Sequence, residues 1–212
     1  MALSSNSIFE KSVIIDFIAI LDFEATCWEK QEQRPNPKVQ EIIEFPTLLV
    51  DTSNGEIISE FHEYVKPEVH KHLSKFCTDL TGIQQQTVDL GANLEEVIKK
   101  HIAWLRLNDL EVIPGDGGKS FAYLTCGDWD LKTCLPNQLA FYRKKPHVCF
   151  HRWINIKHVF TEIIGQKAGG MVGMLKTLNL KLEGRHHSGI DDCKNIHQIA
   201  QQLLKQGWRP TL

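Results

Sequence analysis

The segment FIAILDF, residues 17–23, is apolar on both of its alternating faces. A strand at the centre of a sheet, covered on both sides, requires this pattern. Two further strands are expected at residues 42–50 and 57–65, and Asn54-Gly55 between them is a typical turn sequence. Because the connections are short, these three strands are predicted to form an antiparallel meander.

After residue 90 the sequence predicts helices alternating with strands. In chain order we expect an amphipathic helix over residues 92–106, a strand over 121–126, a short helix from Trp129, a second helical piece with Pro136 near its start, a strand or turn around 151–156, and a final helix from Gly189. This order indicates an α/β fold in which helices flank a mixed five-stranded sheet, the meander plus parallel strands. No repeat or linker divides the sequence, so we expect one domain spanning residues 1–212, with a core of about residues 15–206.

Composition excludes several classes of protein. The formal charge of -2, from 24 Lys and Arg against 26 Asp and Glu, provides no bulk attraction to nucleic acid or to an anionic membrane. The longest apolar run, residues 13–21, contains Asp16 and is far shorter than the roughly 20 residues that cross a bilayer, so no membrane partner is expected. Six cysteines without a CxxC pair favour free thiols in a reducing compartment, the cytoplasm, the nucleus or both.

Two acidic residues stand at the carboxyl end of the first strand. Asp22 and Glu24 are two positions apart, so their side chains leave the same face, roughly 7 Å from each other. Ile18 and Ile20 precede them on that face, where an unpaired ionised carboxylate is costly. An isolated pair of this kind is most often solvated. Other acidic residues are expected at the same edge of the sheet, and together with this pair they favour a functional site.

The final helix brings a second acidic point. Helical spacing places Asp192 on the apolar face with Ile196 and Ile199, so its side chain points inward. The neighbouring Asp191 lies on the polar face, where it complements the positive end of the helix dipole. His187, five residues before Asp192, is expected on the preceding loop and within reach of the same cavity.

A third acidic point follows the strand at residues 121–126. The sequence CGDWD carries Asp128 and Asp130 at a strand-to-helix junction, and spacing alone does not choose between them. Carboxylate oxygens with few soft ligands suit Mg²⁺ or Mn²⁺, whereas the scattered Cys and His lack the spacing of a zinc cage. The sequence therefore predicts a divalent-cation site at the carboxyl edge of the sheet.

Three segments in order resemble the exonuclease motifs of the DEDDh superfamily: LDFEATC (21–27), CGDWDL (126–131) and HHSGIDDCKN (186–195). They are most similar to its Eri-type branch, which includes the histone mRNA 3′-end exonuclease and Snipper-like nucleases. EIIEFP (41–46) and KFCTDLTGI (75–83) extend the resemblance over most of residues 17–204. It implies an RNase H-like fold and 3′-to-5′ hydrolysis of nucleic acid to nucleoside 5′-monophosphates. It also selects Asp130 rather than Asp128, and His187 rather than His186.

The resemblance implies a role for each catalytic residue. By similarity, Asp22 bridges two divalent cations, Mg²⁺ or Mn²⁺, while Glu24 and Asp192 complete the first and Asp130 holds the second. His187 takes the proton from the nucleophilic water as general base. These five residues are the expected catalytic set, and two of them, Glu24 and His187, are also expected to contact the substrate.

Substrate contacts are expected to be stacking contacts, because an enzyme that consumes successive nucleotides cannot insist on one base. The resemblance places Phe76, Leu80 and Trp129 around the terminal base, and Glu24 with the Ala25 backbone at the 3′ hydroxyl. The expected partners are 3′ ends of single-stranded RNA, DNA or both. No separate nucleic-acid-binding module is expected in the chain, which leaves the choice between RNA and DNA open.

Two rival interpretations belong to other classes of protein. DFEAT also resembles the nucleophile motif of haloacid-dehalogenase-type phosphatases, with Asp22 attacking phosphate, although Glu24 replaces the expected second Asp and His187 is left without a role. The other rival is a nucleic-acid-binding module that kept the fold and lost catalysis. The presence of all five expected catalytic residues argues against that loss.

Overall fold

The computed structural model describes residues 14–211. Its strands form one mixed sheet in the order β2-β3-β1-β5-β6, with β4 paired to β3. The strands are β1 (Phe17–Leu21), β2 (Glu24–Ala25), β3 (Ile42–Asp51), β4 (Ile57–Tyr64), β5 (Phe121–Thr125) and β6 (Trp153–Asn155). β1 pairs antiparallel with β3 and parallel with β5, and β5 pairs parallel with β6, so the predicted mixed sheet is confirmed. The sheet has six strands, because the two-residue strand β2 adds to the five predicted.

The helices are α1 (Lys75–Thr81), α2 (Gln85–Asp89), α3 (Leu94–Leu107), α4 (Leu135–Phe141), α5 (Ile156–Ile164), α6 (Met171–Thr177) and α7 (Gly189–Lys205). A π-helical turn (Asp130–Cys134) precedes α4, and 3-10 turns occur at Gln31–Gln33 and Val148–His151. The predicted helices are present as α3, α7 and the π-helical turn with α4. Helices α1, α2, α5 and α6 were not predicted, since an element of two or three turns carries too few apolar positions to establish a period. Within residues 14–211 no helix combines the length and apolar character needed to cross a bilayer.

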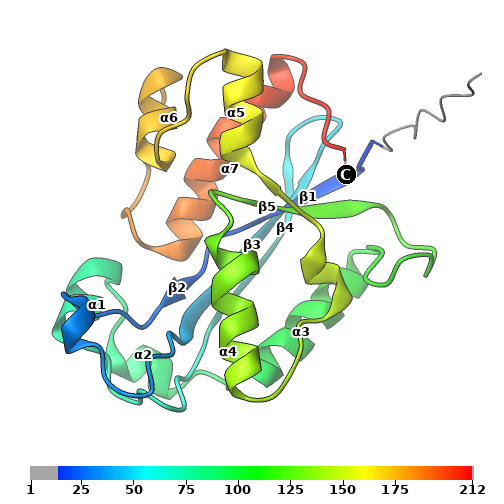
Figure 1. Cartoon of the computed structure of the whole chain (residues 1–212). Helices are drawn as coiled ribbons and strands as arrows, with labels where there is room; N and C mark the ends of the chain where they lie inside the picture. Colours follow the sequence, from blue (N-terminus) through cyan, green and yellow to red (C-terminus); the bar gives the residue numbers. More distant parts are fainter. Residues whose placement is uncertain (1–13, 212) are drawn as a thin grey trace, which may run out of the picture.

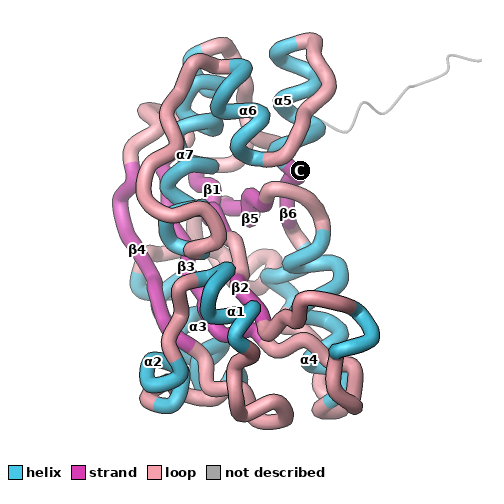
Figure 2. The backbone as a smooth tube through the Cα atoms, turned by 90° about the vertical axis from the view of Figure 1, so that its left-hand side faces the viewer, coloured by secondary structure: helices cyan, strands magenta, loops and turns pink. Residues whose placement is uncertain are grey.

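Helices cover both faces of the sheet (Figures 1 and 2). The alternating side chains of β1 supply both cores: Phe17 and Leu21 pack with residues of α3 and α4, while Ile18 and Ile20 pack with residues of α5, α6 and α7. All five residues of β1 are buried. Burial on both sides of the sheet therefore explains why both alternating faces of β1 are apolar, as the sequence pattern predicted.

A break in the first strand positions the acidic residues. β1 ends at Leu21, opposite Thr47, and β2 resumes at Glu24, opposite Glu44. The prediction of a continuous strand to residue 23 was therefore wrong. In the gap, β3 carries Pro46, which has no N–H with which to continue a ladder. The chain is consequently free to leave the sheet at Asp22.

Candidate active site

Acidic side chains meet at the carboxyl edge of the parallel strands β1 and β5. Asp22 directly follows β1, Glu24 and Ala25 form β2, and Asp130 begins the π-helical turn after β5. Asp192 lies in the first turn of α7, which packs against β1 and β3. The fold thus brings together four carboxylates that the sequence spreads over three distant segments.

Distances place three of the carboxylates in one group, and a hydrogen bond holds the fourth, Asp130, beside them. One oxygen each from Asp22, Glu24 and Asp192 lies within 4.8 Å of the others. Oδ1 of Asp130 accepts a 2.9 Å hydrogen bond from the main-chain N–H of Phe23, the residue between Asp22 and Glu24. The exposed fractions of Glu24, Asp130 and Asp192 are only 9%, 5% and 4%. Water alone therefore solvates these charges poorly.

Asp128, the other acid of the same motif, is directed elsewhere. Its Oδ1 accepts hydrogen bonds from the Trp153 indole N–H, at 3.1 Å, and from the Asn155 side-chain amide, at 3.3 Å. Both partners belong to β6. The geometry therefore supports Asp130 as the member of the acidic group and gives Asp128 a structural role at the edge of the sheet.

Burial raises the pKa of every carboxyl in the group. For Asp22 the pKa rises well above its usual value, first through burial and then through the charges of Asp130, Asp192 and Glu24. Burial is also the largest cause at Glu24, whose pKa rises to about 9, and at Asp130, whose pKa rises to about 6. Burial raises the pKa of Asp192 against the lowering effect of His186. At neutral pH the group cannot ionise fully unless cations neutralise it.

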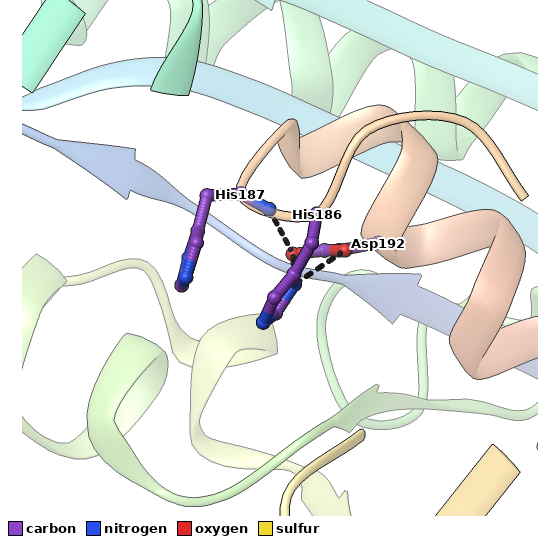
Figure 3. A group of neighbouring side chains, drawn as sticks. All are labelled: His186, His187 and Asp192. Carbon is purple, nitrogen blue, oxygen red and sulfur yellow. Dashed lines mark hydrogen bonds and ion pairs between the residues drawn. The ribbon is translucent and has the colours of Figure 1, made fainter. Parts of the chain in front are cut away.

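Two histidines flank Asp192 (Figure 3). Nδ1 of His186 lies 3.2 Å from Oδ2 of Asp192, whereas His187 reaches the same oxygen through its main-chain N–H, at 3.0 Å. The His187 ring stacks on the His186 ring with 3.9 Å between centroids. Burial, with the charge of His186, lowers the pKa of His187. The imidazole predicted as general base is therefore neutral at neutral pH, at the rim of the acidic group.

Glu44, on β3, is a site residue that the sequence-based prediction missed. Glu44 is only 1% exposed. Its carboxylate accepts hydrogen bonds from the N–H groups of Gly189, at 2.9 Å, and Ile190, at 3.1 Å. It also lies 2.8 Å from Nε2 of His62. After burial, its charge is the largest cause that raises the pKa of Glu24. Glu44 thus holds the start of α7 against the sheet. In the sequence, the available signal for this residue was an acidic side chain within a mostly apolar strand.

Two of the residues predicted to contact the base are exposed aromatic side chains. Phe76 on α1 and Trp129 before the π-helical turn are 38% and 41% exposed, unusually accessible for large aromatic side chains. Leu80 lies one turn after Phe76 on α1 and is half-buried. The Ser74 hydroxyl, the N-cap of α1, donates to the Cys27 carbonyl oxygen at 2.6 Å. This bond attaches α1 to the segment that follows β2.

The histidine loop is also tied to α1. The Arg185 guanidinium donates to the main-chain carbonyl oxygens of Asp79 and Leu80, the latter at 3.3 Å. It packs so closely on Gly82, the left-handed C-cap of α1, that a Cβ there would lie 3.1 Å from it. The main-chain N–H of Arg185 donates to Asp191 at 2.9 Å. The helix that carries Phe76 and the loop that carries the histidines are therefore joined.

A mixed sheet with carboxylates gathered where its central strand ends defines the class of RNase H-like nucleases. The chain belongs to the exonuclease family: the RNase_T family model, described as Exonuclease, matches residues 19–200. The family resemblance seen in the sequence is thereby confirmed.

Named relatives lie within the same family. The chain is 41% identical over 193 residues to human ERI1 exoribonuclease 3, a match that covers 91% of this chain and 55% of the relative. It is 39% identical over 196 residues to human 3′-5′ exoribonuclease 1, covering 91% of this chain and 53% of that protein. The chain thus spans about half the length of these curated relatives.

Solved structures confirm the fold. The nuclease domain of 3′hExo, a DEDDh family member bound to rAMP, superposes with a TM-score of 0.79 at 38% identity, covering 91% of this chain and 94% of that one. Cell-death related nuclease 4 (CRN-4) gives a TM-score of 0.78 at 28% identity, covering 91% and 65%. The predicted RNase H-like α/β fold is therefore correct.

The DEDDh exonuclease family depends on divalent metal ions, and the side chains of this chain fit such ions. Its donor set consists of carboxylate oxygens, the ligands that Mg²⁺ and Mn²⁺ prefer. The raised pKa values of Asp22 and Glu24 show how much uncompensated negative charge the fold concentrates there. Cations would replace the protons that otherwise neutralise these carboxylates.

Proposed function

We propose that this protein is a 3′-to-5′ exonuclease that shortens single-stranded RNA and releases nucleoside 5′-monophosphates. The observation that carries the proposal is the convergence of Asp22, Glu24, Asp130 and Asp192 at one sheet edge, with His187 beside them. Support comes from the relatives named exoribonucleases and from the similar nuclease domain bound to rAMP.

Two Mg²⁺ or Mn²⁺ ions are proposed at the acidic group. Asp22 would bridge both, Glu24 and Asp192 would complete the first, and Asp130 would hold the second. When bound, such ions supply the positive charge that activates water and stabilises the leaving 3′ oxygen. Burial keeps bulk water from screening the carboxylates, which strengthens their attraction for cations. The Phe23 N–H keeps Asp130 turned toward the group.

His187 is proposed to take the proton from the attacking water at a ring nitrogen. Its lowered pKa keeps that nitrogen unprotonated at neutral pH, as a general base requires. The hydrogen bond from its main chain to Asp192 anchors His187 beside the acidic group. The tie between Arg185 and Leu80 holds the loop in place while substrate binds.

The polarity of digestion is proposed to follow from the terminal nucleotide pocket. Phe76 and Trp129 would stack on the last base, with Leu80 beside it, because aromatic faces accept any base. Glu24 and the Ala25 main chain would contact the 3′ hydroxyl. A strand with a blocked 3′ end would then fit badly and resist hydrolysis.

The test incubates 5′-end-labelled single-stranded RNA with the protein and Mg²⁺ or Mn²⁺ and follows the ladder on a gel. Asp22→Asn should abolish laddering. Asp128→Asn is the matched control, since it changes an acid of the same motif that faces β6, and it should keep wild-type activity. A 3′-phosphorylated RNA should resist digestion. Laddering of that blocked RNA, or full activity of Asp22→Asn, contradicts the proposal.

The same experiment separates the remaining alternatives. Single-stranded DNA of the same sequence, run in parallel, determines whether the protein also degrades DNA. RNA binding without cleavage, measured by fluorescence anisotropy, would identify an idle binding module. Family membership argues against a haloacid-dehalogenase-type phosphatase, and trapping of an aspartyl-phosphate on Asp22 would be needed to reopen that interpretation.

A further inference from the structure

The adjacent histidines His186 and His187 have an unusual backbone. His187 has a φ of 66°, in the left-handed region, which a non-glycine residue adopts only at a cost in free energy. Neighbouring side chains in an extended strand point to opposite sides, but here the two rings stack at 22° to each other (Figure 3). The positive φ therefore places two imidazoles on the same side of the chain.

Specific hydrogen bonds maintain this conformation. The His187 N–H donates to Asp192, and the Arg185 N–H donates to Asp191. Both acceptors lie in the first turn of α7, and the Arg185 guanidinium binds Leu80 on α1. The loop is thus held at both ends. Strain kept in this way is typical of functional sites rather than of ordinary surface loops.

The two imidazoles and Asp192 form a group of metal-ligating atoms. Ligand atoms of His186, His187 and Asp192 all lie within 4.8 Å of one another. Nδ1 of His186 and Oδ2 of Asp192 are already 3.2 Å apart, close to the roughly 3.3 Å that separates two ligands of a tetrahedral zinc ion. A rotation of the half-buried His187 ring would bring in the third ligand, and water would occupy the fourth position.

The chemistry of these donors differs from that of the acidic group. Two nitrogens and one carboxylate oxygen suit Zn²⁺ and similar transition metals, whereas Mg²⁺ prefers oxygen ligands alone. The His186 side chain is 42% exposed, so an ion can reach it from solvent. No zinc site was expected from the sequence, because its scattered Cys and His lack the spacing of a zinc cage.

We propose that His186, His187 and Asp192 form a second, zinc-selective cation site that inhibits the enzyme when occupied. Asp192 also belongs to the oxygen group with Asp22 and Glu24, so the two sites share a ligand and compete. An ion held by the histidines would withdraw both Asp192 and the His187 ring from catalysis. The inhibitory effect rests on the proposed exonuclease function, whereas the binding site itself does not.

Binding is tested on the full chain without substrate. Zn²⁺ affinity is measured by competition with a chromophoric chelator, and Co²⁺ is added separately to record the visible absorption of four-coordinate nitrogen–oxygen ligation. His186→Gln should weaken Zn²⁺ binding at least tenfold and remove the Co²⁺ band. His158→Gln, on an exposed position of α5, is the matched control and should bind like the wild type. Equal Zn²⁺ affinity of His186→Gln and wild type would overturn the proposal.

A second variant covers the case in which His186→Gln alters the fold. His187→Gln, used in the binding titration alone, should also lower the Zn²⁺ affinity at least tenfold. Unchanged affinity in this variant, with circular dichroism like that of the wild type, would likewise overturn the three-ligand site.

Inhibition is tested by adding Zn²⁺ to the RNA assay at fixed, saturating Mg²⁺, with each protein normalised to its own zinc-free rate. The wild type and His158→Gln should be inhibited alike, and His186→Gln should need at least tenfold more Zn²⁺. Inhibition at the same Zn²⁺ concentration in all three proteins would contradict the proposal. Absence of RNA cleavage in zinc-free buffer would instead refute the proposed function, and the binding titration would still decide the present inference.

Discussion

Several ionisable side chains in this protein are buried, and burial disfavours their charged forms. At the acidic group the effect raises the pKa of Asp22 and Glu24. In the core the effect is opposite for His101, which is fully buried and whose pKa falls to about 3. The raised pKa values at the acidic group favour cation binding, because bound cations would neutralise the carboxylates. The lowered pKa of His101 makes the stability of the fold depend on pH.

His187→Asn separates proton transfer from cation binding. Asparagine tolerates a positive φ well, so the loop should keep its conformation. With the general base removed, we expect kcat for RNA to fall about 10²–10⁴-fold. Manganese binding, measured by calorimetry, should remain within a few-fold of the wild type, because the four carboxylates are intact. A kcat within threefold of the wild type would show that His187 is not the base.

His101→Phe tests the effect of a buried neutral histidine on acid stability. Its folded pKa of about 3 lies below the usual 6.5, so the unfolded chain alone takes up a proton between these values. Stability therefore falls as pH decreases through that window, by about 3 kcal/mol at pH 4.5. Phenylalanine would keep the packing on Phe45 and Phe150 and lose only the bond to the Tyr123 hydroxyl.

Urea unfolding at pH 7 and pH 4.5 checks this expectation. The difference in unfolding free energy between the two pH values should be about 3 kcal/mol smaller in His101→Phe than in the wild type. His158→Gln, which alters an exposed histidine, should keep the wild-type difference. Identical pH dependence of wild type and His101→Phe would mean that His101 is protonated in the folded protein.

Helix α7 is the element on which the site depends. Its first turn rests on the Glu44 carboxylate through the N–H groups of Gly189 and Ile190, and it carries Asp192. A buried carboxylate at this end also complements the positive end of the helix dipole. The docking of α7 therefore sets the position of Asp192 relative to the residues that follow β1.

Gly189→Ala should disturb this docking. A Cβ at Gly189 would lie 2.7 Å from the main-chain oxygen of Asp22 and 3.0 Å from the ring Cγ of Pro46, and neither the backbone nor the rigid proline ring can easily move away. We expect a loss of about 1–3 kcal/mol in unfolding free energy and weaker Mn²⁺ binding. Gly173→Ala, in α6 with no atom within 4 Å of the added Cβ, is the control and should stabilise the protein by about 0.5–1 kcal/mol. Equal stability of the two variants would contradict the close packing at Gly189.

At the scale of the whole molecule, the cation site should make stability depend on pH and metal together. The raised pKa of Glu24, about 9, means that the folded protein holds a proton that the unfolded chain releases above pH 4.5. Stability in the absence of metal should therefore fall as pH rises from 4.5 to 9. Cations remove this penalty by replacing the proton, so their stabilising effect should be larger at pH 8 than at pH 5.5.

Differential scanning fluorimetry with and without Mn²⁺ measures this effect. The same Mn²⁺ concentration is used at both pH values; where it is a hundredfold above the Kd at pH 8, the free-energy gain at that pH is about 2.7 kcal/mol, equivalent to a rise in Tm of about 5–10 °C. Asp22→Asn should have a higher Tm than the wild type without metal, because it removes repulsion, and should respond little to Mn²⁺. A Mn²⁺ response that is equal at both pH values, or equal in the two proteins, would contradict the account.

Much of the architecture follows from local patterns. The buried strand β1, the hairpin of β3 and β4 with Gly55 at positive φ, and the amphipathic helices α3 and α7 follow from periodicity and turn residues. The inward direction of Asp192 follows from helical spacing, and the structure places it among the acidic residues. The choice of Asp130 came from family resemblance, since spacing alone left Asp128 equally eligible.

Chain order and hydrophobic period therefore suffice to predict the main strands, the acidic pair that follows the first strand and the orientation of the last helix, because these depend on neighbours a few positions away. The break between β1 and β2, the hydrogen bonds from α7 to Glu44 and the pairing of His186 with Asp192 depend on folding. They are settled by packing and charge between atoms that meet only when distant segments dock. The local periodicity of the sequence does not determine such tertiary contacts.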